Sequence, residues 1–187
     1  MVGKTMMLHR YHTPAGFNNL LLSTDGEALT GLWFEGSRKH QDDPVEVQDV
    51  VSLPNVLRET CRWLDLYFAG HQPDFTPEYR IEGFTSFRKE VSDIMREIPF
   101  GATITYGEIA NLIARKQGIP KMSAQAVGGA VGWNPICIIV PCHRVMGANG
   151  NLTGYGGGIH NKIALLRHEG HVVNRFSCQK YSVFLRP

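Results

Sequence analysis

A segment rich in proline and turn-forming residues, HQPDFTPEYRIEG (71–83), separates two parts of the chain whose patterns differ. Before it, apolar or mixed segments are separated by the turn signals PAG and TDGE, which is typical of an antiparallel sheet. A charged connection is expected over 37–54, followed by a segment with helical spacing of apolar residues. We therefore predict an N-terminal domain over 1–82, with its boundary near residues 80–84. Its expected elements are strands within 6–13, 17–24 and 28–36 and a covering helix over 55–70.

Helical patterns dominate the chain beyond this boundary. Two short helices joined by the turn GIPKM match the helix-turn-helix arrangement of DNA-binding proteins. The second of them carries Ala126, Gly129 and Ala130 three or four residues apart, which would allow close approach to DNA or to a neighbouring element. A β-branched apolar run, ICIIV (136–140), predicts a buried strand. The expected helices lie within residues 85–98, 105–117, 123–133 and 160–170.

The charge changes sign at the same boundary. Residues 1–82 carry 7 Lys/Arg against 12 Asp/Glu, a net charge of −5, whereas 83–187 carries 12 against 5, a net charge of +7. A basic half of this kind is typical of a polyanion binder. No run of about 18 uncharged apolar residues and no signal peptide is found, so we expect no membrane partner and a cytoplasmic protein, or a nuclear one in a eukaryote. We assign 83–170 to a second domain and 171–187 to a C-terminal extension.

The dipeptide Cys142-His143 follows the predicted strand. A thiolate is a strong nucleophile, and a nearby histidine helps to form it. Consecutive residues of an extended strand point to opposite faces, so contact between the two side chains needs a bend after Pro141 or a bridging water. Glu169 is the carboxylate whose helix could return to orient the imidazole.

The residues alone leave three roles open for Cys142. A metal site needs three or four convergent ligands, and Cys137, Cys142 and His143 have no recognisable zinc spacing. A buried structural thiol is the ordinary alternative, and we assign Cys61 and Cys137 to it, while Cys178 gives no basis for a role. With no CxxC pair in the chain, all four cysteines are expected to be reduced. Position at a strand end in the basic half favours the nucleophile.

The segment IIVPCHRVMG, preceded by AVGGAVGWNP and followed by GYGGG and LLRHEG, resembles the O6-alkylguanine-DNA alkyltransferases, also called methylated-DNA–protein-cysteine methyltransferases. The match extends from about Ser86 to Gly170. It implies an α+β fold: a ribonuclease H-like support domain with a small antiparallel sheet, and a mostly helical, winged-helix-like domain with the helix-turn-helix. It implies irreversible, single-turnover transfer of an alkyl group to Cys142 from O6 of guanine, with O4 of thymine as a second candidate substrate. The base must be flipped out of the stack before a thiolate can reach it.

The resemblance also implies the catalytic residues. Cys142 is the alkyl acceptor, His143 is the base acting through water, and Glu169 completes the relay. Asn134 ties the active-site turn to the helix-turn-helix. Tyr106 assists rotation of the target phosphate and can protonate N3 of the leaving guanine, which is a poor leaving group as an anion.

Substrate and DNA contacts are implied in the same way. Tyr155 and Gly156 line the base pocket, with the Gly156 amide facing O6, and the carbonyls of Cys142 and Val145 accept from the exocyclic amine. We expect DNA contacts from both helices, from their connection and from the active-site turn. These are Gln125, Ala126, Gly129, Lys116, Lys121 and Arg144.

One position departs from the family pattern. The family typically has an arginine before Ala-Val-Gly-Gly-Ala, inserted through the minor groove to fill the place of the flipped base, and this chain has Gln125. Glutamine lacks the cation, so we expect weaker DNA binding with the transfer chemistry intact.

The implied partner is alkylated double-stranded DNA, bound by a monomer through the minor groove, with no cofactor. We also predict a metal-free protein, because His9, His12 and Cys61 are too scattered for an N-terminal zinc site. One alternative is a non-enzymatic, alkyltransferase-like lesion-binding protein, although such relatives lack the cysteine. Another is a cysteine hydrolase or transferase acting on small molecules, which does not suit the basic half.

Overall fold

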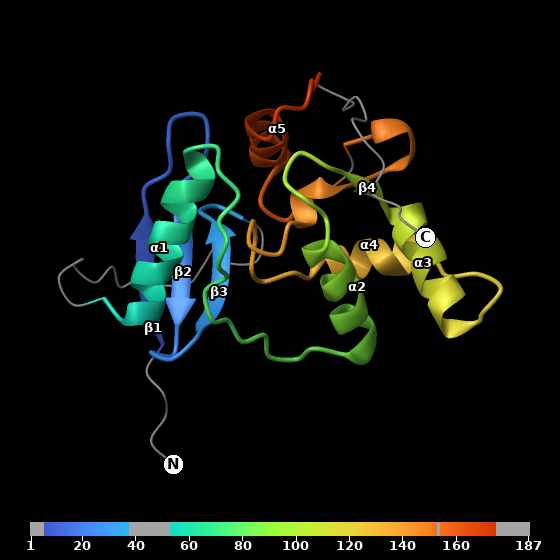
Figure 1. The fold of residues 1–187 in the computed structure, drawn as a ribbon, viewed down its shortest axis with the longest axis horizontal. Helices are drawn as coiled ribbons and strands as arrows, with labels where there is room; N and C mark the ends of the chain where they lie inside the picture. The colour runs from blue at the N-terminus through green and yellow to red at the C-terminus, as the bar shows by residue number, and fades with distance from the viewer. Residues whose placement is uncertain (1–5, 38–52, 153, 175–187) are drawn as a thin grey trace, which may run out of the picture. The chain divides into compact units, whose positions relative to one another are not determined.

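The computed structural model (Figure 1) describes residues 6–37, 53–152 and 154–174. The chain divides into two compact units, Met1–Gly83 and Phe84–Pro187, and each is described by itself. Most of the connection expected over 37–54 and most of the extension expected over 171–187 lie outside the described residues, as does Cys178. Within the described part of the chain, no helix is long and apolar enough to cross a membrane.

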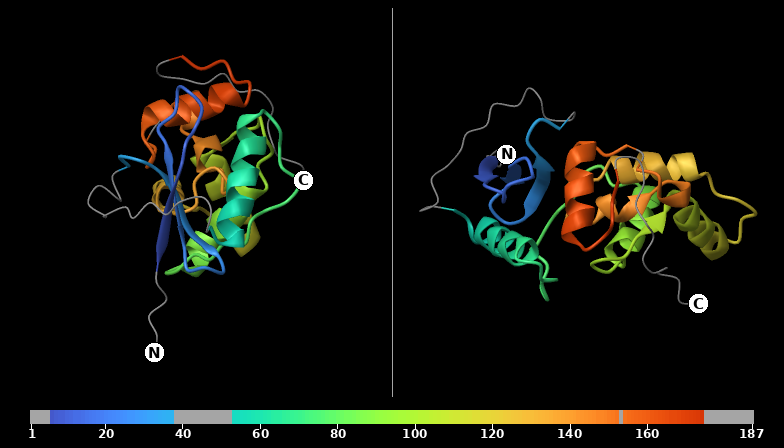
Figure 2. Two further views of the ribbon diagram at one scale, coloured as in Figure 1. Left: turned by 90° about the vertical axis from the view of Figure 1, so that its left-hand side faces the viewer. Right: turned by 90° about the horizontal axis from the view of Figure 1, so that it is seen from above.

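The first unit is a three-stranded antiparallel sheet with one helix against it. Its elements are β1 (Met7–Tyr11), β2 (Leu20–Thr24), β3 (Leu29–Phe34) and α1 (Asn55–Phe68). The strand order is β1-β2-β3, with Leu20 paired to Tyr11 on one side and to Phe34 on the other. Figures 1 and 2 show α1 along one face of this sheet, where it contacts β2 and β3. The predicted small sheet with a covering helix is confirmed.

The second unit is mostly helical and contains every residue of the predicted site. Its elements are α2 (Ser86–Arg96), β4 (Ile104–Thr105), α3 (Tyr106–Gln117), α4 (Ala124–Gly132), the 3-10 helix η2 (Cys142–Arg144), β5 (Val145–Met146), the 3-10 helix η3 (Ala148–Gly150) and α5 (Ile159–His168). The helices α2, α3 and α4 pack on one another. All four helices predicted for this part of the chain are present.

Side-chain caps determine where these helices begin. The hydroxyls of Thr85 and Ser123 each accept a hydrogen bond from an amide in the first turn of α2 and α4. At α3, Thr105 accepts from the amide of Glu108, and the Glu108 carboxylate accepts from the amide of Thr105, which is a capping box. Such caps are worth about 1 kcal/mol each because they satisfy amides that have no partner in the helix. Tyr106 is thereby fixed as the first residue of α3.

A short parallel strand pair links the start of α3 to the residues that follow Cys142-His143. Ile104 pairs with Val145 and Thr105 pairs with Met146. Strands of two residues show no alternation, so the sequence does not predict them. Since α3 begins directly after β4, and η2 ends directly before β5, both are anchored in the same pair of strands.

The segment 136–140 is a buried turn, and the prediction of a strand there is wrong. The Asn134 Oδ1 accepts from the amide of Ile136 at 3.1 Å, and Nδ2 donates to the carbonyls of Ile136 and Val140 at 3.1 and 2.9 Å. The Val140 amide donates to the Ile136 carbonyl, and Ile138 has a left-handed φ of 68°. A local side chain has replaced the ladder bonds of a strand. The apolar sequence therefore reflects burial and not extended backbone.

Candidate active site

Cys142 is the first residue of η2 and is only 5% exposed. Its Sγ accepts a hydrogen bond of 3.1 Å from Nδ2 of Asn134, the same amide group that holds the 136–140 turn. The backbone amide of Cys142 donates to the Val140 carbonyl at 2.8 Å. One asparagine therefore fixes both the turn and the sulfur that follows it.

The surroundings of Cys142 favour its thiolate. Its pKa is lowered to about 7, first by a hydrogen bond from the Cys137 thiol. Burial opposes this change, and the hydrogen bond from Asn134, the positive charge of Lys162 and the nearby hydroxyl of Tyr155 reinforce it. A cysteine with this pKa is ionised to a large extent at neutral pH, which makes it a competent nucleophile. Cys137 is buried, as expected, but it is also a neighbour of the nucleophile.

His143 and Glu169 form a fully buried pair. His143 Nε2 lies 2.7 Å from Oε1 of Glu169, and neither side chain is exposed. Because the carboxylate can only accept, Nε2 carries the proton, and Nδ1 is left with its lone pair. This Nδ1 is buried and has no hydrogen-bond partner within the described residues. The chain bends into η2 after Pro141, so the sequence-adjacent Cys142 and His143 are not in an extended strand.

The pKa values of this pair keep the histidine neutral and the carboxylate charged. Burial lowers the pKa of His143, helped by the charges of Arg144 and Lys162, although Glu169 acts in the opposite direction. For Glu169, burial alone raises the pKa, but His143 and Arg144 together outweigh it and hold the pKa far below its ordinary value. A neutral imidazole oriented by a carboxylate is the protonation state that a general base requires.

Arg144 lies in the interior and is only 7% exposed, so the prediction of a DNA contact for it is corrected. Its Nε donates to Oε2 of Glu169 at 2.9 Å, and its Nη1 donates to the carbonyl of Ile98 at 2.6 Å. The amide of Gly101 donates to the same carboxylate at 3.1 Å. Arg144 therefore neutralises Glu169 and is not available to a phosphate.

Lys162, on α5, is a member of the site that the sequence analysis missed. Its side chain is completely buried, and Nζ donates to the carbonyl of Val145 at 2.7 Å. One lone pair of that carbonyl is thus occupied, and the second remains for another donor. A signal did exist, since Lys162 shares the inward face of α5 with Leu165 and Leu166, three and four residues on.

The other predicted substrate contacts lie at the edge of this centre. Tyr106 is half-buried at the start of α3, with its ring 3.9 Å from the position that a Cβ on Gly128 would take. Tyr155 is half-buried, and Gly156 beside it is exposed. A Cβ on Gly156 would lie 3.8 Å from the nearest protein atom, so packing within the chain does not require glycine there.

Gln125, Ala126 and Gly129 are exposed on α4, as are Ala124 and Gly132 at its two ends. Ala130, which we expected on the same bare face as Ala126 and Gly129, is buried, so that prediction is wrong. Of the two lysines expected to contact DNA, Lys121 is exposed in the connection before α4, and Lys116 forms an ion pair of 3.1 Å with Glu90.

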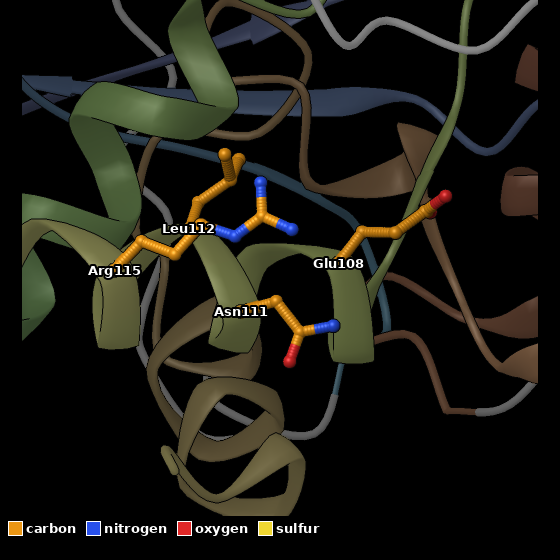
Figure 3. A pocket seen from close by; sticks show the side chains of 4 residues that line it. All are labelled: Glu108, Asn111, Leu112 and Arg115. Carbon is orange, nitrogen blue, oxygen red and sulfur yellow. The ribbon is translucent and has the colours of Figure 1, made fainter. Parts of the chain in front are cut away.

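A shallow pocket of about 50 Å³ lies on α3 (Figure 3). It is lined by Glu108, Asn111, Leu112 and Arg115, all from the one helix. None of these is a nucleophile, and the buried centre around Cys142 is the stronger candidate for chemistry.

Comparison with known proteins identifies relatives along most of the chain. Residues 86–171 match the family model described as 6-O-methylguanine DNA methyltransferase, DNA binding domain. A protein of Methanosarcina acetivorans named methylated-DNA–protein-cysteine methyltransferase is 45% identical over 161 residues, covering 86% of this chain and 96% of that one. A protein of Mycobacterium tuberculosis with the same name is 42% identical over 168 residues, covering 87% and 93%.

Solved structures give the same result. A crystal structure of Mycobacterium tuberculosis O6-methylguanine methyltransferase is similar with a TM-score of 0.66 at 39% identity, covering 88% of this chain and 93% of that one. A crystal structure of Mycobacterium tuberculosis OGT in complex with DNA has a TM-score of 0.67 at 38% identity, covering 86% and 92%. The fold and the site define a class of proteins with a buried, reactive cysteine in a DNA-binding domain. The chain belongs to the methylated-DNA–protein-cysteine methyltransferase family, so the resemblance seen in the sequence is confirmed.

Proposed function

We propose that this protein repairs alkylated DNA by direct reversal, with Cys142 taking the alkyl group from O6 of guanine. The S–C bond forms as the C–O6 bond breaks, and the guanine becomes neutral when it gains a proton. The observation that carries the proposal is the buried Cys142 sulfur, ionised near neutral pH and held by Asn134, within the domain that matches the family model. The product is a thioether, which is no longer a nucleophile, so each molecule acts once.

His143 takes up the thiol proton. Its Nδ1 is the free acceptor of a neutral ring, and a single bridging water can carry the proton from Cys142. The ionised Glu169 then stabilises the imidazolium that forms, as in other histidine–carboxylate pairs. The buried contact of 2.7 Å between His143 and Glu169 supports these roles.

The flipped guanine lies against Tyr155 and Gly156. The carbonyls of Cys142 and Val145 accept from its exocyclic amine, and the Gly156 amide faces O6. Tyr106 is assigned two roles, assistance to rotation of the target phosphate and protonation of N3. Their support is the position of Tyr106 at the start of α3, directly after β4, the strand that pairs with the residues following η2.

The DNA partner is bound through its minor groove by the exposed face of α4. Extrusion of the base is required because O6 is not accessible to in-line attack within the duplex. Gln125 occupies the place of the flipped base, and Lys121 and Lys116 contact phosphates. The protein acts as a monomer, in which 83–170 is the winged-helix-like catalytic domain and 1–82 a ribonuclease H-like support domain, followed by an extension.

Methyl uptake from DNA tests this function. The protein is incubated with an equimolar duplex that contains one O6-methylguanine, and its intact mass is measured, with an unmodified duplex as control. We expect a gain of one methyl group per protein, located on Cys142 by peptide mapping. Cys142→Ala should gain nothing, whereas Cys61→Ala, at a half-buried cysteine of the first unit, should gain the full amount. Binding of the lesion without any mass gain would favour the non-enzymatic alternative.

A further inference from the structure

A buried asparagine ties the loop before α5 to that helix. Asn161 is fully buried, and its Nδ2 donates a hydrogen bond of 2.7 Å to the carbonyl of Gly157. Gly157 is buried as well, and the Gly158 amide donates to the Tyr155 carbonyl at 3.0 Å. Residues 154–158 thus form a glycine-rich turn whose Gly157 carbonyl is held by a side chain of the helix that follows.

This 154–158 loop lies beside the segment that holds the nucleophile. A Cβ on Gly156 would be 3.8 Å from the carbonyl of Gly132, at the end of α4. Two residues further on, Asn134 donates to Sγ of Cys142 at 3.1 Å. The position of Gly156 relative to the sulfur therefore depends on how the loop is held.

The next residue of α5 makes a similar contact on the other side of the nucleophile. Lys162 is fully buried, and its Nζ donates at 2.7 Å to the carbonyl of Val145, directly after η2. Consecutive side chains of α5, Asn161 and Lys162, thus bind one carbonyl in the loop and one after η2. The first turn of α5 fixes the two segments with respect to each other.

We propose that Asn161 is a positioning residue for the alkyl transfer, because its amide holds Tyr155 and Gly156 where the flipped guanine binds. This inference rests on the proposed function, in which these two residues contact the base. Glycines give a loop many backbone conformations, and ordering them costs entropy. A loop that is already fixed avoids this cost when the base arrives.

Removal of the donor should release the loop. Without the Asn161 amide, the Gly157 carbonyl would be buried and unpaired, which costs free energy. The loop can avoid this cost by moving into water, because the neighbouring Gly154 and Gly156 are already exposed. Such a movement displaces the Gly156 amide from O6 and leaves the hydrogen bonds of the Cys142 turn intact.

The test compares Asn161→Leu, which keeps the size of the side chain and removes the donor, with the matched control Thr60→Val. Thr60 is also fully buried, and its hydroxyl donates at 2.7 Å to the carbonyl four residues earlier, on α1 of the first unit. In Asn161→Leu, methyl transfer at a saturating concentration of O6-methylguanine duplex should be about tenfold slower than in wild type. Affinity for an unmodified duplex should be unchanged, and alkylation of Cys142 by iodoacetamide should not be slower. Thr60→Val should match wild type in all three measurements.

Exchange of the loop amides for deuterium, followed by NMR, reports on the loop directly. The Gly158 amide should exchange about fivefold faster in Asn161→Leu than in wild type, because its turn opens more often. Unchanged exchange at Gly158, an unchanged rate at saturation, or an equal fall in the methyl-transfer and iodoacetamide rates would each overturn the proposal.

If Asn161→Leu does not fold, Asn161→Ala takes its place, and a Gly158 amide that is unprotected in the wild-type protein overturns the proposal without any variant. A wild-type protein that takes no methyl group from DNA refutes the proposed function. The exchange rates, which need no DNA, still show in that case whether Asn161 holds the loop.

Discussion

At the scale of single residues, Glu169 organises the buried cluster that follows Cys142. Its carboxylate accepts hydrogen bonds from the side chains of His143 and Arg144 and from the amide of Gly101. The same carboxylate thus orients the imidazole and neutralises a buried guanidinium. The orientation of His143 depends on a residue 26 positions away, more than on its neighbour Cys142.

Glu169→Gln should destabilise the second unit strongly. The amide keeps the shape of the side chain, but Arg144 is left as a buried charge without a counter-ion, which typically costs about 3–5 kcal/mol. The measurement is urea unfolding of the second unit. Asp93→Asn is the matched control, since Asp93 pairs with Lys89 and Arg96 on the exposed surface of α2, where a pair is worth about 1 kcal/mol or less. Equal losses in the two variants would contradict this account of Glu169.

Chemically distinctive residues are the ones that the sequence predicts well. Cys142, His143 and Glu169 were selected by residue type and motif, and the structure brings the last two into contact. The positions of Lys162 and Cys137 near the sulfur could not be predicted, because they depend on the course of the backbone between them. The DNA contact predicted for Arg144 is wrong because its guanidinium is buried against Glu169, a partner that only the structure reveals.

At the scale of elements, helix ends are predicted better than short apolar segments. Thr85 and Ser123 cap α2 and α4 at the first residues of the ranges expected for these helices, 85–98 and 123–133, because a cap acts on amides within three residues. The strand predicted over 136–140 is wrong for a different reason. Apolar runs of this length do not distinguish a strand from a buried turn, and the outcome depends on the side chain of Asn134. The strand pair of β4 and β5 is also non-local, with partners about 40 residues apart.

The exposed face of α4 allows the departure at Gln125 to be tested directly. Gln125→Arg adds a cation on this face, so binding to a duplex with O6-methylguanine should tighten severalfold and methyl transfer from it should accelerate. The slope of log K against log salt should steepen by about 0.9 for each additional phosphate that the arginine neutralises. Gln125→Ala serves as the control without a cation, and transfer from the free base O6-methylguanine should be unchanged in both variants. An arginine variant that is no faster than wild type on duplex DNA would refute the role assigned to this position.

At the scale of the whole molecule, the two units should respond to pH in opposite directions. In the second unit, the pKa values of Cys142, His143 and Glu169 are all lowered on folding, so the unfolded chain binds more protons and stability rises with pH. These contributions are complete above about pH 8.5, 6.5 and 4.3 respectively, the ordinary pKa values of the three groups. In the first unit, burial and Asp65 raise the pKa of Cys61 to about 11, and the pKa of Tyr11 is raised as well. The stability that Cys61 and Tyr11 contribute to the first unit is lost as the pH rises above their ordinary pKa values.

The stability of each unit is measured by unfolding in urea at a series of pH values between 5.5 and 9.5. After equilibration, a brief deuterium pulse at one fixed pH reports how much of each unit is unfolded. The second unit should become more stable from about pH 6 to 8.5, while the first unit stays level and then loses stability above about pH 8.5. Cys142→Ala should remove the part of the rise between about pH 7 and 8.5, because the ionising group is absent. Parallel pH responses in the two units would show that these groups do not control stability.

The parallel pair of β4 and β5 has a mechanical consequence. It joins the first residue of α3 and the last residue of η2 through hydrogen bonds between Ile104–Thr105 and Val145–Met146. A hinge motion between α3 and η2 would have to break these hydrogen bonds. We therefore expect α3 and Cys142 to move together. The Cys142 sulfur is therefore expected to keep the same position relative to α3 for every base that reaches it. Discrimination between bases is then expected to depend on how far the DNA deforms to bring a base to Cys142.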